Sequence, residues 1–455
     1  MTGTPIDAAS TIFAALAGVA AVGYLVIKFR ERAGAESAEH REVEGIADQK
    51  LMEAVSQLGD AAPTVRIAGV YALADVADRY GGAYRQRVVD ILCGYLRTDR
   101  LVRDQHGALR YQLGDDGQPD TGRPVSRDGA VESTILATIA NHLRLPDPYS
   151  PTDGQLRGDQ LWCGCHVDLH ATHFTEQVDF TGARFDQDVT FAGATFSGNA
   201  WFDMASFAGR AVFARVLFRG DAGFEHAKFD QKAMFVGATF THTAGFAYVT
   251  FSGDAGFNHA TFRQAAGFSH ATFAGDAQFD GVLVCRDAVF DGATFKQAAT
   301  FDRDLPANRD AIFGGTATFM HATFEQAAGF SHATFGASAV FAWAEFDQDA
   351  WFADTKFSGD TTFNAAMIRG DAKFWRATFS GKADFDYARF DKDAWFTRAR
   401  FDGEVGFDGV MFKRPALGMS MASSWFPASL KEPGRDLPPG AHWVTDLPTP
   451  APDPD

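Results

Sequence analysis

From about Val167 to Lys413, a phenylalanine returns every five or six residues along the chain. The two spacings alternate, so the full period is eleven residues. A small residue, usually alanine, stands two places before most of the phenylalanines, as in Ala194-Thr195-Phe196. Residues two apart share a face only where the backbone is extended. The pattern therefore predicts a series of short β-strands, each followed by a turn, with alanine and phenylalanine side chains pointing inward.

A short fixed period is typical of a solenoid. The undecad, A-x-F-x-x alternating with A-x-F-x-x-x, resembles the pentapeptide-repeat family in a variant whose every second unit has one extra residue. The departures keep an apolar residue: Val284 and Ile368 replace phenylalanine, and Val216, Val249 and Val282 replace alanine. The resemblance implies a right-handed quadrilateral β-helix over residues 167–413. Each coil would take 22 residues, and about ten coils would stack at roughly the 4.8 Å parallel strand spacing.

One interruption falls inside the repeats. Phe301 and Phe313 are twelve residues apart where the pattern requires five. We expect seven of the residues 302–310 to loop out of the coil. The inward faces should then continue in register after the loop.

Residues 8–27 form an apolar run of about 20 residues, the length needed to cross a bilayer. Lys28, Arg30 and Arg32 follow at once, whereas no basic residue precedes the run. A secretory signal carries its positive charge ahead of the apolar run, so we predict a transmembrane anchor at residues 1–32. A buried or interfacial helix is the alternative. The positive-inside rule places the N-terminus outside and the rest of the chain in the cytoplasm.

Between the predicted anchor and the repeats, we expect a helical stalk at 33–47 and an α-helical module at 48–145. Apolar periodicity predicts the module's helices at Gln49–Leu58, Thr64–Arg79, Tyr84–Leu96 and Glu132–Leu143. Val65–Leu73 resembles a HEAT-type helix. Residues 101–130 are rich in aspartate, glycine and arginine and predict an internal loop, and residues 146–166 predict a linker and a cap on the first coil. This order of segments is similar to actinobacterial membrane-anchored members of the pentapeptide-repeat family.

The period stops after Phe412. Residues 414–431 contain large apolar side chains and predict a C-terminal cap, which solenoids require at an open end. Residues 432–455 are rich in proline and aspartate and predict a disordered acidic tail.

Composition narrows the classes of function. The 455 residues carry a formal net charge of −17, which argues against nucleic-acid binding because phosphate backbones attract lysine and arginine. The 44 phenylalanines are accounted for by the repeat core, so no cofactor is predicted. The four cysteines, Cys93, Cys163, Cys165 and Cys285, fit a reducing compartment.

Histidines and cysteines raise the question of a metal site. One cluster precedes the repeats: Cys163, Cys165, His166, His170 and His173. Closed zinc sites usually pair C-x-x-C with a distant second pair, and the C-x-C spacing here does not fit, so no metal is predicted. Histidines within the repeats that share a face fall two or three coils apart, too far to share an ion. They are predicted as turn residues: His226, His259, His270, His321 and His332.

Catalytic motifs are absent from the sequence: it has no G-x-S-x-G, Walker loop, H-E-x-x-H, or G-x-G-x-x-G after a strand. Three aspartate pairs resemble paired carboxylates: Asp186/Asp188, Asp347/Asp349 and Asp391/Asp393. Each pair follows an inward phenylalanine, where aspartate favours the turn itself, and a filled solenoid leaves no internal pocket. The chain is therefore predicted not to be an enzyme.

Four of the eight tryptophans lie in the C-terminal third of the repeats: Trp343, Trp351, Trp375 and Trp395. Trp351, Lys373 and Trp395 are spaced by 22 residues, which should stack them on one outer face with the lysine stem between two indoles, a cation–π ladder. Exposed, clustered tryptophans are typical of binding hot spots. These five residues are the candidate partner-binding surface. The alternative is that the ladder only stiffens the sheet.

The combined features predict a non-enzymatic, membrane-tethered scaffold that displays a rigid β-helix to an unknown cytoplasmic protein. The family supplies an alternative, since some members resemble DNA in shape and charge and protect DNA gyrase. An acidic repeat region suits such a mimic, but basic residues interrupt it and the predicted anchor removes it from the nucleoid. The oligomeric state stays open, as does whether the helical module carries the binding.

Overall fold

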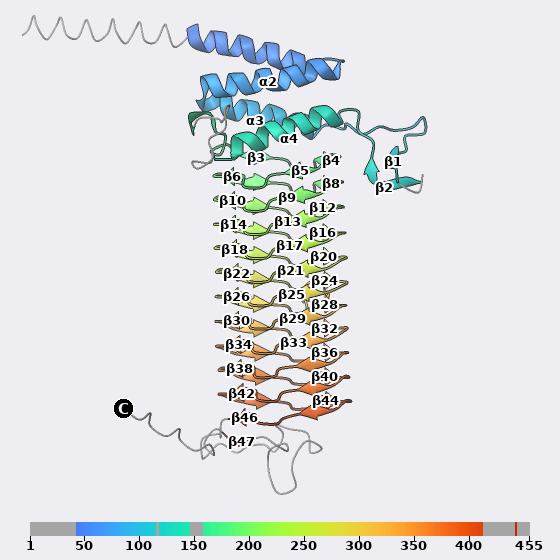
Figure 1. The fold of residues 1–455 in the computed structure, drawn as a ribbon, viewed down its shortest axis with the longest axis vertical. Helices are drawn as coiled ribbons and strands as arrows, with labels where there is room; N and C mark the ends of the chain where they lie inside the picture. The colour runs from blue at the N-terminus through green and yellow to red at the C-terminus, as the bar shows by residue number, and fades with distance from the viewer. Residues whose placement is uncertain (1–41, 115–117, 146–157, 413–441, 444–455) are drawn as a thin grey trace, which may run out of the picture. The chain divides into compact units, whose positions relative to one another are not determined.

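The structure, a computed structural model, describes residues 42–114, 118–145, 158–412 and 442–443 (Figure 1). The described residues divide into two compact units, one that ends at Tyr80 and one that begins at Gly81. The predicted anchor at 8–27 and the predicted cap at 414–431 lie outside the described residues. Among the helices that are described, none combines the length and the apolar character that a bilayer crossing needs.

The first unit contains a helix over residues 42–58 and helix α2 (Pro63–Tyr80). The first of these runs through the predicted boundary between stalk and module, because Ala47, Leu51, Ala54 and Leu58 continue one buried stripe. Gly69 of α2 allows the two helices to approach, since a Cβ there would lie 2.6 Å from the backbone nitrogen of Leu58.

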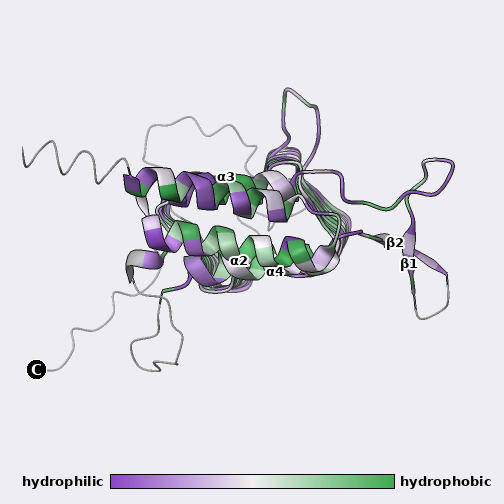
Figure 2. Ribbon diagram, turned by 90° about the horizontal axis from the view of Figure 1, so that it is seen from above, coloured by the Kyte–Doolittle hydropathy of each residue, from purple (hydrophilic) through white to green (hydrophobic). Residues whose placement is uncertain are grey.

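The second unit begins with α3 (Gly82–Leu96), a hairpin, α4 (Gly129–Leu143) and a short 3-10 helix (Gly158–Gln160). The hairpin pairs β1 (Tyr111–Leu113) antiparallel with β2 (Pro119–Pro124), so the prediction of a plain loop over 101–130 is wrong at its centre. Both strands are largely exposed and lack the apolar alternation that marks a strand in sequence. The hairpin projects to one side of the coils in two perpendicular views (Figures 1 and 2).

The repeats form a four-sided β-solenoid, as the period predicted, with about 11 turns where about ten coils were expected. Its strands are two residues long, and the four faces start at β3 (Val167–Asp168), β4 (His173–Phe174), β5 (Val178–Asp179) and β6 (Arg184–Phe185). The same faces end at β43 (Ala394–Trp395), β44 (Arg400–Phe401), β45 (Val405–Gly406) and β46 (Met411–Phe412). Parallel partners are 22 residues apart, as in Phe207 with Phe229.

The inserted loop obeys the predicted register. β24 (Leu283–Val284) pairs with β28 (Ile312–Phe313), so partners there are 29 residues apart, seven more than elsewhere. The faces on either side of the loop remain continuous, because β27 (Ala299–Thr300) still pairs with β31 (Ala328–Gly329). The extra residues therefore lengthen one corner without shifting the core.

The core consists of stacked phenylalanine columns with buried alanines beside them. Phe235 and Phe257 stack with ring centroids 4.8 Å apart and planes 2° apart, whereas Phe257 meets Phe268 edge to face at 5.3 Å. The substituted positions Val284 and Ile368 are also buried. Burial of each large apolar side chain contributes about 1.5–3 kcal/mol relative to exposure. The phenylalanine columns therefore dominate the stability of the solenoid.

The corners that end the five-residue units contain a residue with positive φ, a conformation that glycine adopts most readily. Many of these positions carry larger side chains instead. Five histidines of the repeats occupy this position: His226, His259, His270, His321 and His332. Residues 22 positions apart occupy the same corner of successive coils. The rings of His226, Tyr248 and His270 therefore stack, with neighbouring centroids 4.9 Å apart.

Helices α3 and α4 contact the first coil at β3 and β5. A buried ion pair secures this junction: Arg100 Nη1 donates to Glu132 Oε2 at 2.6 Å, and Glu132 Oε1 accepts the backbone N–H of Thr175 at 2.7 Å. Trp162, in the segment predicted to cap the first coil, is buried and stacks on His142 of α4 at 3.9 Å. The apolar first coil is thereby covered.

At the other end, β47 (His442–Trp443) pairs parallel with β46. These two residues belong to the segment 432–455 that was predicted to be disordered, so the prediction is wrong for them. The physical reason is that the last coil presents unpaired N–H and C=O groups, which an extended segment can pair. The remainder of 432–455 lies outside the described residues.

Candidate functional site

Three residues of the candidate surface lie on one outer face of the solenoid. β35 (Ala350–Trp351), β39 (Ala372–Lys373) and β43 are consecutive strands of one sheet. Trp351 pairs in register with Lys373, and Lys373 with Trp395. The predicted stacking of these three positions is therefore confirmed, while their role in binding stays a prediction.

Lys373 does not share its charge between two indoles as predicted. Its Nζ lies 3.6 Å from the ring centroid of Trp351 and 2.9 Å from Oδ2 of Asp349. The carboxylate draws the ammonium toward Trp351, and the lysine side chain is only 12% exposed. Burial raises the pKa of Asp349, but hydrogen bonds from Lys373 and from the N–H of Asp371 outweigh it, so this pKa is lowered. The result is one cation–π pair held by an ion pair.

Trp395 packs against Trp375 instead. Their ring centroids are 6.3 Å apart with planes at 79°, an edge-to-face contact. Trp375 lies in the corner between β39 and β40 (Thr378–Phe379), directly after the buried Phe374. The corner residue of one coil and the strand residue of the next therefore form one aromatic wall.

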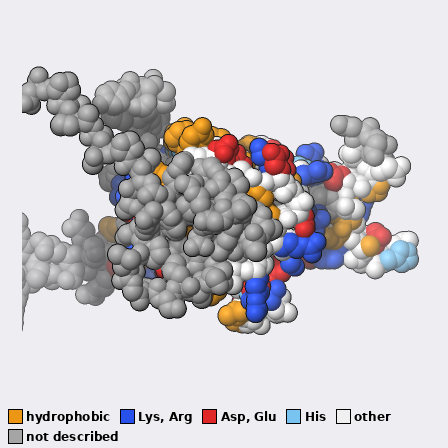
Figure 3. All heavy atoms as spheres, turned by 90° about the horizontal axis from the view of Figure 1, so that it is seen from below, with side chains coloured by type: hydrophobic (Ala, Val, Ile, Leu, Met, Phe, Trp, Pro, Cys, Tyr) orange, Lys and Arg blue, Asp and Glu red, His pale blue; other side chains and the backbone are white. Residues whose placement is uncertain are grey.

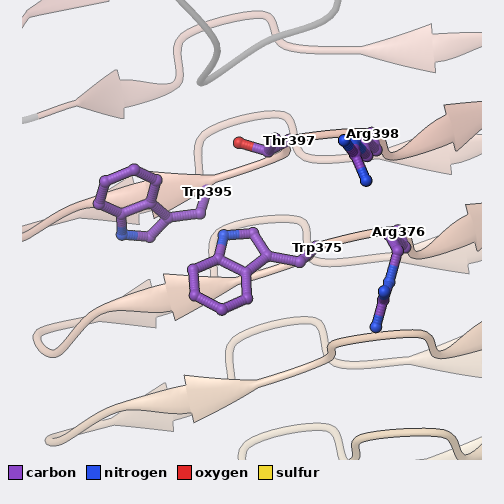
Figure 4. Close-up of a pocket in the computed structure, with 5 residues that line it drawn as sticks. All are labelled: Trp375, Arg376, Trp395, Thr397 and Arg398. Atoms are coloured by element: carbon purple, nitrogen blue, oxygen red, sulfur yellow. The ribbon is translucent and has the colours of Figure 1, made fainter. Parts of the chain in front are cut away.

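An open hollow of about 550 Å³ adjoins this wall. Its lining residues are Trp375, Arg376, Trp395, Thr397 and Arg398. Figure 4 shows the two indoles on one side of the hollow and the two arginines on the other, with Thr397 between them. The hollow thus offers aromatic and cationic groups to the same ligand.

Sequence reasoning did not assign the two arginines to the site. Arg376 and Arg398 both have positive φ and are 22 residues apart, so they stack at one corner of successive coils. Arg376 pairs with Asp354 of the preceding coil, whereas Arg398 has no carboxylate partner among the residues that the structure describes. The signal that could have found them is their common place two residues after an inward phenylalanine in a five-residue unit.

Trp343 does not belong to this surface. It lies in the corner between β33 (Ala339–Val340) and β34 (Glu345–Phe346), with a positive φ, and it stacks on His321 at 6.1 Å. That corner is diagonally opposite the corner of Trp375. The prediction that all five residues share one surface is wrong for Trp343, because the corner positions of Trp343 and Arg376 are three undecads apart and successive undecads turn at opposite corners of the coil. We therefore define the tryptophan surface by six residues: Trp351, Lys373, Trp375, Arg376, Trp395 and Arg398.

The repeat segment matches the family model described as pentapeptide repeats (9 copies). The matched segments are 166–204, 202–250, 246–284, 257–303, 321–367 and 363–411, which together cover about half of the chain. The chain belongs to the pentapeptide-repeat family. The unmatched residues 304–320 contain most of the inserted loop of this pentapeptide-repeat solenoid. No curated protein and no solved structure matches the chain. Pentapeptide-repeat solenoids are generally structural or interaction folds, and nothing observed in this one indicates catalysis.

The cysteine and histidine cluster serves the junction between the helices and this solenoid. Cys163 and Cys165 are buried, and burial raises the pKa of the Cys165 thiol to about 11, which disfavours the thiolate that binds metals. His170 pairs with Asp168 at 2.6 Å, and His173 contacts Ser197 at 3.0 Å. Within the described residues, no group of three or more potential ligands is placed to hold a metal ion.

The aspartates of the turns link successive coils of the repeat solenoid. Asp188 accepts both the backbone N–H and the guanidinium of Arg210, one coil further on, and Asp347 pairs with Arg369. Asp302, half-buried at the start of the inserted loop, differs from these aspartates because its partial burial raises its pKa to about 6. It accepts the N–H of Ser331. These carboxylates satisfy turns, and their contacts account for the aspartate pairs seen in the sequence.

Proposed function

We propose that this pentapeptide-repeat protein is a non-enzymatic scaffold and that a partner protein binds its tryptophan surface. The observation that carries the proposal is the exposure of large aromatic rings on rigid strands, with Trp351 38% and Trp375 42% exposed. Tryptophan and arginine dominate binding hot spots. A soluble surface rarely clusters such residues without an interaction to cover them.

The rigidity of the fold supports this role. Trp351 and Trp395 follow alanines that are fully buried, and the next residues, Phe352 and Phe396, are also fully buried. The backbone beneath both indoles is therefore fixed before a partner arrives, which lowers the entropy that binding costs. Truncation of a hot-spot residue costs about 2 kcal/mol or more, at least roughly 30-fold in affinity.

We further propose that residues 8–27 tether the scaffold to a membrane, with the solenoid on the cytoplasmic side. The basic residues that follow the apolar run support this orientation. Protease added to intact spheroplasts should leave the solenoid whole, and should digest its exposed segments once the membrane is permeabilised. Digestion in intact spheroplasts would refute the orientation.

The partner-binding proposal is tested by capture from solubilised membranes with the full chain as bait. The double variant Trp351→Ala with Trp395→Ala should lose a partner that the unchanged chain captures, because both indoles point outward. Trp343→Ala is the matched control, since it removes an exposed tryptophan from the opposite corner. Circular dichroism should be the same for all three chains. Equal capture by the folded double variant would place the binding elsewhere, with residues 48–145 as the next candidate.

Recovery of topoisomerase subunits in the same experiment would favour the alternative of a DNA mimic. The net charge of −17 is in the right direction for that alternative. However, basic residues pair with the turn carboxylates across coils, as in Arg210 with Asp188 and Arg369 with Asp347. Figure 3 shows acidic and basic side chains interspersed on the described part of the end-on view. A mimic of DNA requires a continuous acidic surface, so we favour the scaffold.

A further inference from the structure

We infer that the hollow beside Trp375, Trp395 and Arg398 binds an acidic, proline-rich peptide, and that its occupant is the chain's own segment 444–455. The inference concerns regulation of the tryptophan surface. Its consequence for partner binding rests on the proposed function, whereas the docking itself is measured separately.

The aromatic wall of the hollow suits proline. Proline-rich segments adopt polyproline II helices in advance of binding and dock in aromatic-lined grooves, which keeps the entropic cost low. Trp375 and Trp395 meet edge to face, so together they present an angled apolar surface to such a helix. The hollow, at about 550 Å³, has the size of sites that enclose a small ligand or a few residues of peptide.

The cationic wall suits aspartate. Arg398 is exposed at its corner and has no acidic partner among the described residues. Arg376 beside it already shares its charge with Asp354, so Arg398 is the group that gains most from an incoming carboxylate. A guanidinium binds a carboxylate through two parallel N–H donors. The ligand should therefore carry acidic residues close to its prolines.

The segment 444–455 has this chemistry. Its sequence, Val-Thr-Asp-Leu-Pro-Thr-Pro-Ala-Pro-Asp-Pro-Asp, contains four prolines at alternate positions, three aspartates and no lysine or arginine. Alternate prolines favour polyproline II. The charge of the segment is opposite to that of Arg398. Both requirements of the hollow are met by residues of the same short segment.

The position of the segment allows it to reach the hollow. It follows directly after β47, which pairs with β46 at the end of the solenoid. In the preceding coil, Arg398 is the eighth residue after Phe390 of β42 (Arg389–Phe390), a strand on the same face as β46. Twelve residues in polyproline II span about 37 Å, more than this path requires. Attachment to the same chain also gives an effective concentration on the order of millimolar.

A segment docked in this way covers Trp375 and Trp395, which belong to the tryptophan surface. A partner would have to displace it, so the chain would regulate access to its own binding surface. If the docked state is about ten times more populated than the undocked state, the apparent affinity for the partner falls by about the same factor.

Fluorescence anisotropy of a labelled synthetic peptide of residues 444–455 tests the docking. The receptor is the full chain with its own segment reversed in charge by Asp446→Lys, Asp453→Lys and Asp455→Lys. We expect the peptide to bind this chain and to bind the unchanged chain at least tenfold more weakly, because there the native segment occupies the hollow. Equal binding to both chains, or binding to neither, would overturn the inference.

Variants of the hollow locate the binding. In the charge-reversed chain, Arg398→Glu and Trp375→Ala should each weaken the peptide at least tenfold. Arg263→Glu and Trp343→Ala, exposed residues of the same types outside the hollow, are the matched controls. Arg398 is exposed on a turn, so its variant keeps the test valid if Trp375→Ala disturbs the fold. If the peptide bound both hollow variants as tightly as it bound the charge-reversed chain, the inference would be overturned.

Partner capture separates this inference from the proposed function. If the segment docks as inferred, the charge-reversed chain should capture more partner than the unchanged chain. If the peptide did not bind, but capture of a partner still required Trp351, only the inference would be refuted. Peptide docking without any Trp351-dependent partner would refute only the proposed function.

Discussion

Replacing Phe257 by alanine should destabilise the solenoid strongly, because this ring lies at the centre of the phenylalanine columns. Phe257 is fully buried. It stacks on Phe235 and Phe279 at 4.8 and 4.9 Å and meets Phe246 and Phe268 edge to face at 5.4 and 5.3 Å. Neighbouring rings are held by their own strands in adjacent coils, so they cannot collapse into the space that the substitution leaves.

The expected loss in the free energy of unfolding is about 3–5 kcal/mol, the range for removing a buried phenylalanine and leaving a cavity. We expect the upper half of the range. The reasons are the rigid surroundings and the aromatic pairs, each of which contributes roughly 0.5–1.5 kcal/mol beyond the area it buries. These pair contributions are not additive, since the same ring makes all of them.

Urea denaturation followed by circular dichroism measures this loss, and native-state amide exchange shows whether coils open locally, as nearest-neighbour coupling in a solenoid allows. The matched control is Thr239→Ala, which changes an outward, half-buried residue of β16 (Thr239–Phe240). Its cost should stay below about 1 kcal/mol, the span of strand propensities. Thr261 is a less suitable control because the guanidinium of Arg309 reaches its hydroxyl at 3.4 Å.

The reasoning would be refuted if Phe257→Ala and Thr239→Ala had the same denaturation midpoint and slope. That result would mean that the phenylalanine columns do not carry the stability of the rod. A change in slope alone would instead indicate that the two-state description had failed.

Three other predictions concern charge and packing. Glu132→Ala should lower the free energy of unfolding by roughly 3–5 kcal/mol, because Arg100 is left buried and unpaired; thermal denaturation measures this, and an equal loss on changing exposed Glu53 would contradict it. Because burial raises the pKa of Asp302 to about 6, its contribution is present below the unfolded pKa near 4 and is lost as the pH rises through about 6. Asp302→Asn should therefore stabilise the chain at pH 7.5 by on the order of 2 kcal/mol and have little effect at pH 4; the same gain at both pH values would refute this. Gly370→Ala should cost about 1–3 kcal/mol or more, since its Cβ would lie 2.1 Å from the backbone carbon of Gln348; a cost no larger than for Gly164→Ala, where no atom lies within 4 Å, would contradict it.

The core of this protein could be predicted from sequence because the fold is nearly one-dimensional. Each residue of the solenoid meets residues at fixed offsets of 22 along the chain, so a period of eleven determines strand, face and register together. The same logic located the seven-residue loop and placed Trp351, Lys373 and Trp395 in one row. In a fold whose strands are joined by connections of different lengths, a hydrophobic pattern alone would not have determined which strands pair.

The details of the site depended on competition between alternative side-chain contacts, which the repeat period does not determine. Asp349 attracts the ammonium of Lys373, and Trp375 packs against Trp395 in the next coil. These outcomes follow from side-chain packing between residues 20 to 24 apart in neighbouring coils, where small differences in direction select the partner.

The junction with the helices was likewise decided by tertiary structure. The buried pair of Arg100 and Glu132 joins segments without any repeat, and the hairpin β1–β2 forms from polar residues that lack apolar alternation. Sequence alone thus determined the regular core, since apolar burial at a fixed period leaves one solution. Only the folded structure decided which polar and aromatic groups meet at the ends and corners, because there several contacts of similar energy compete.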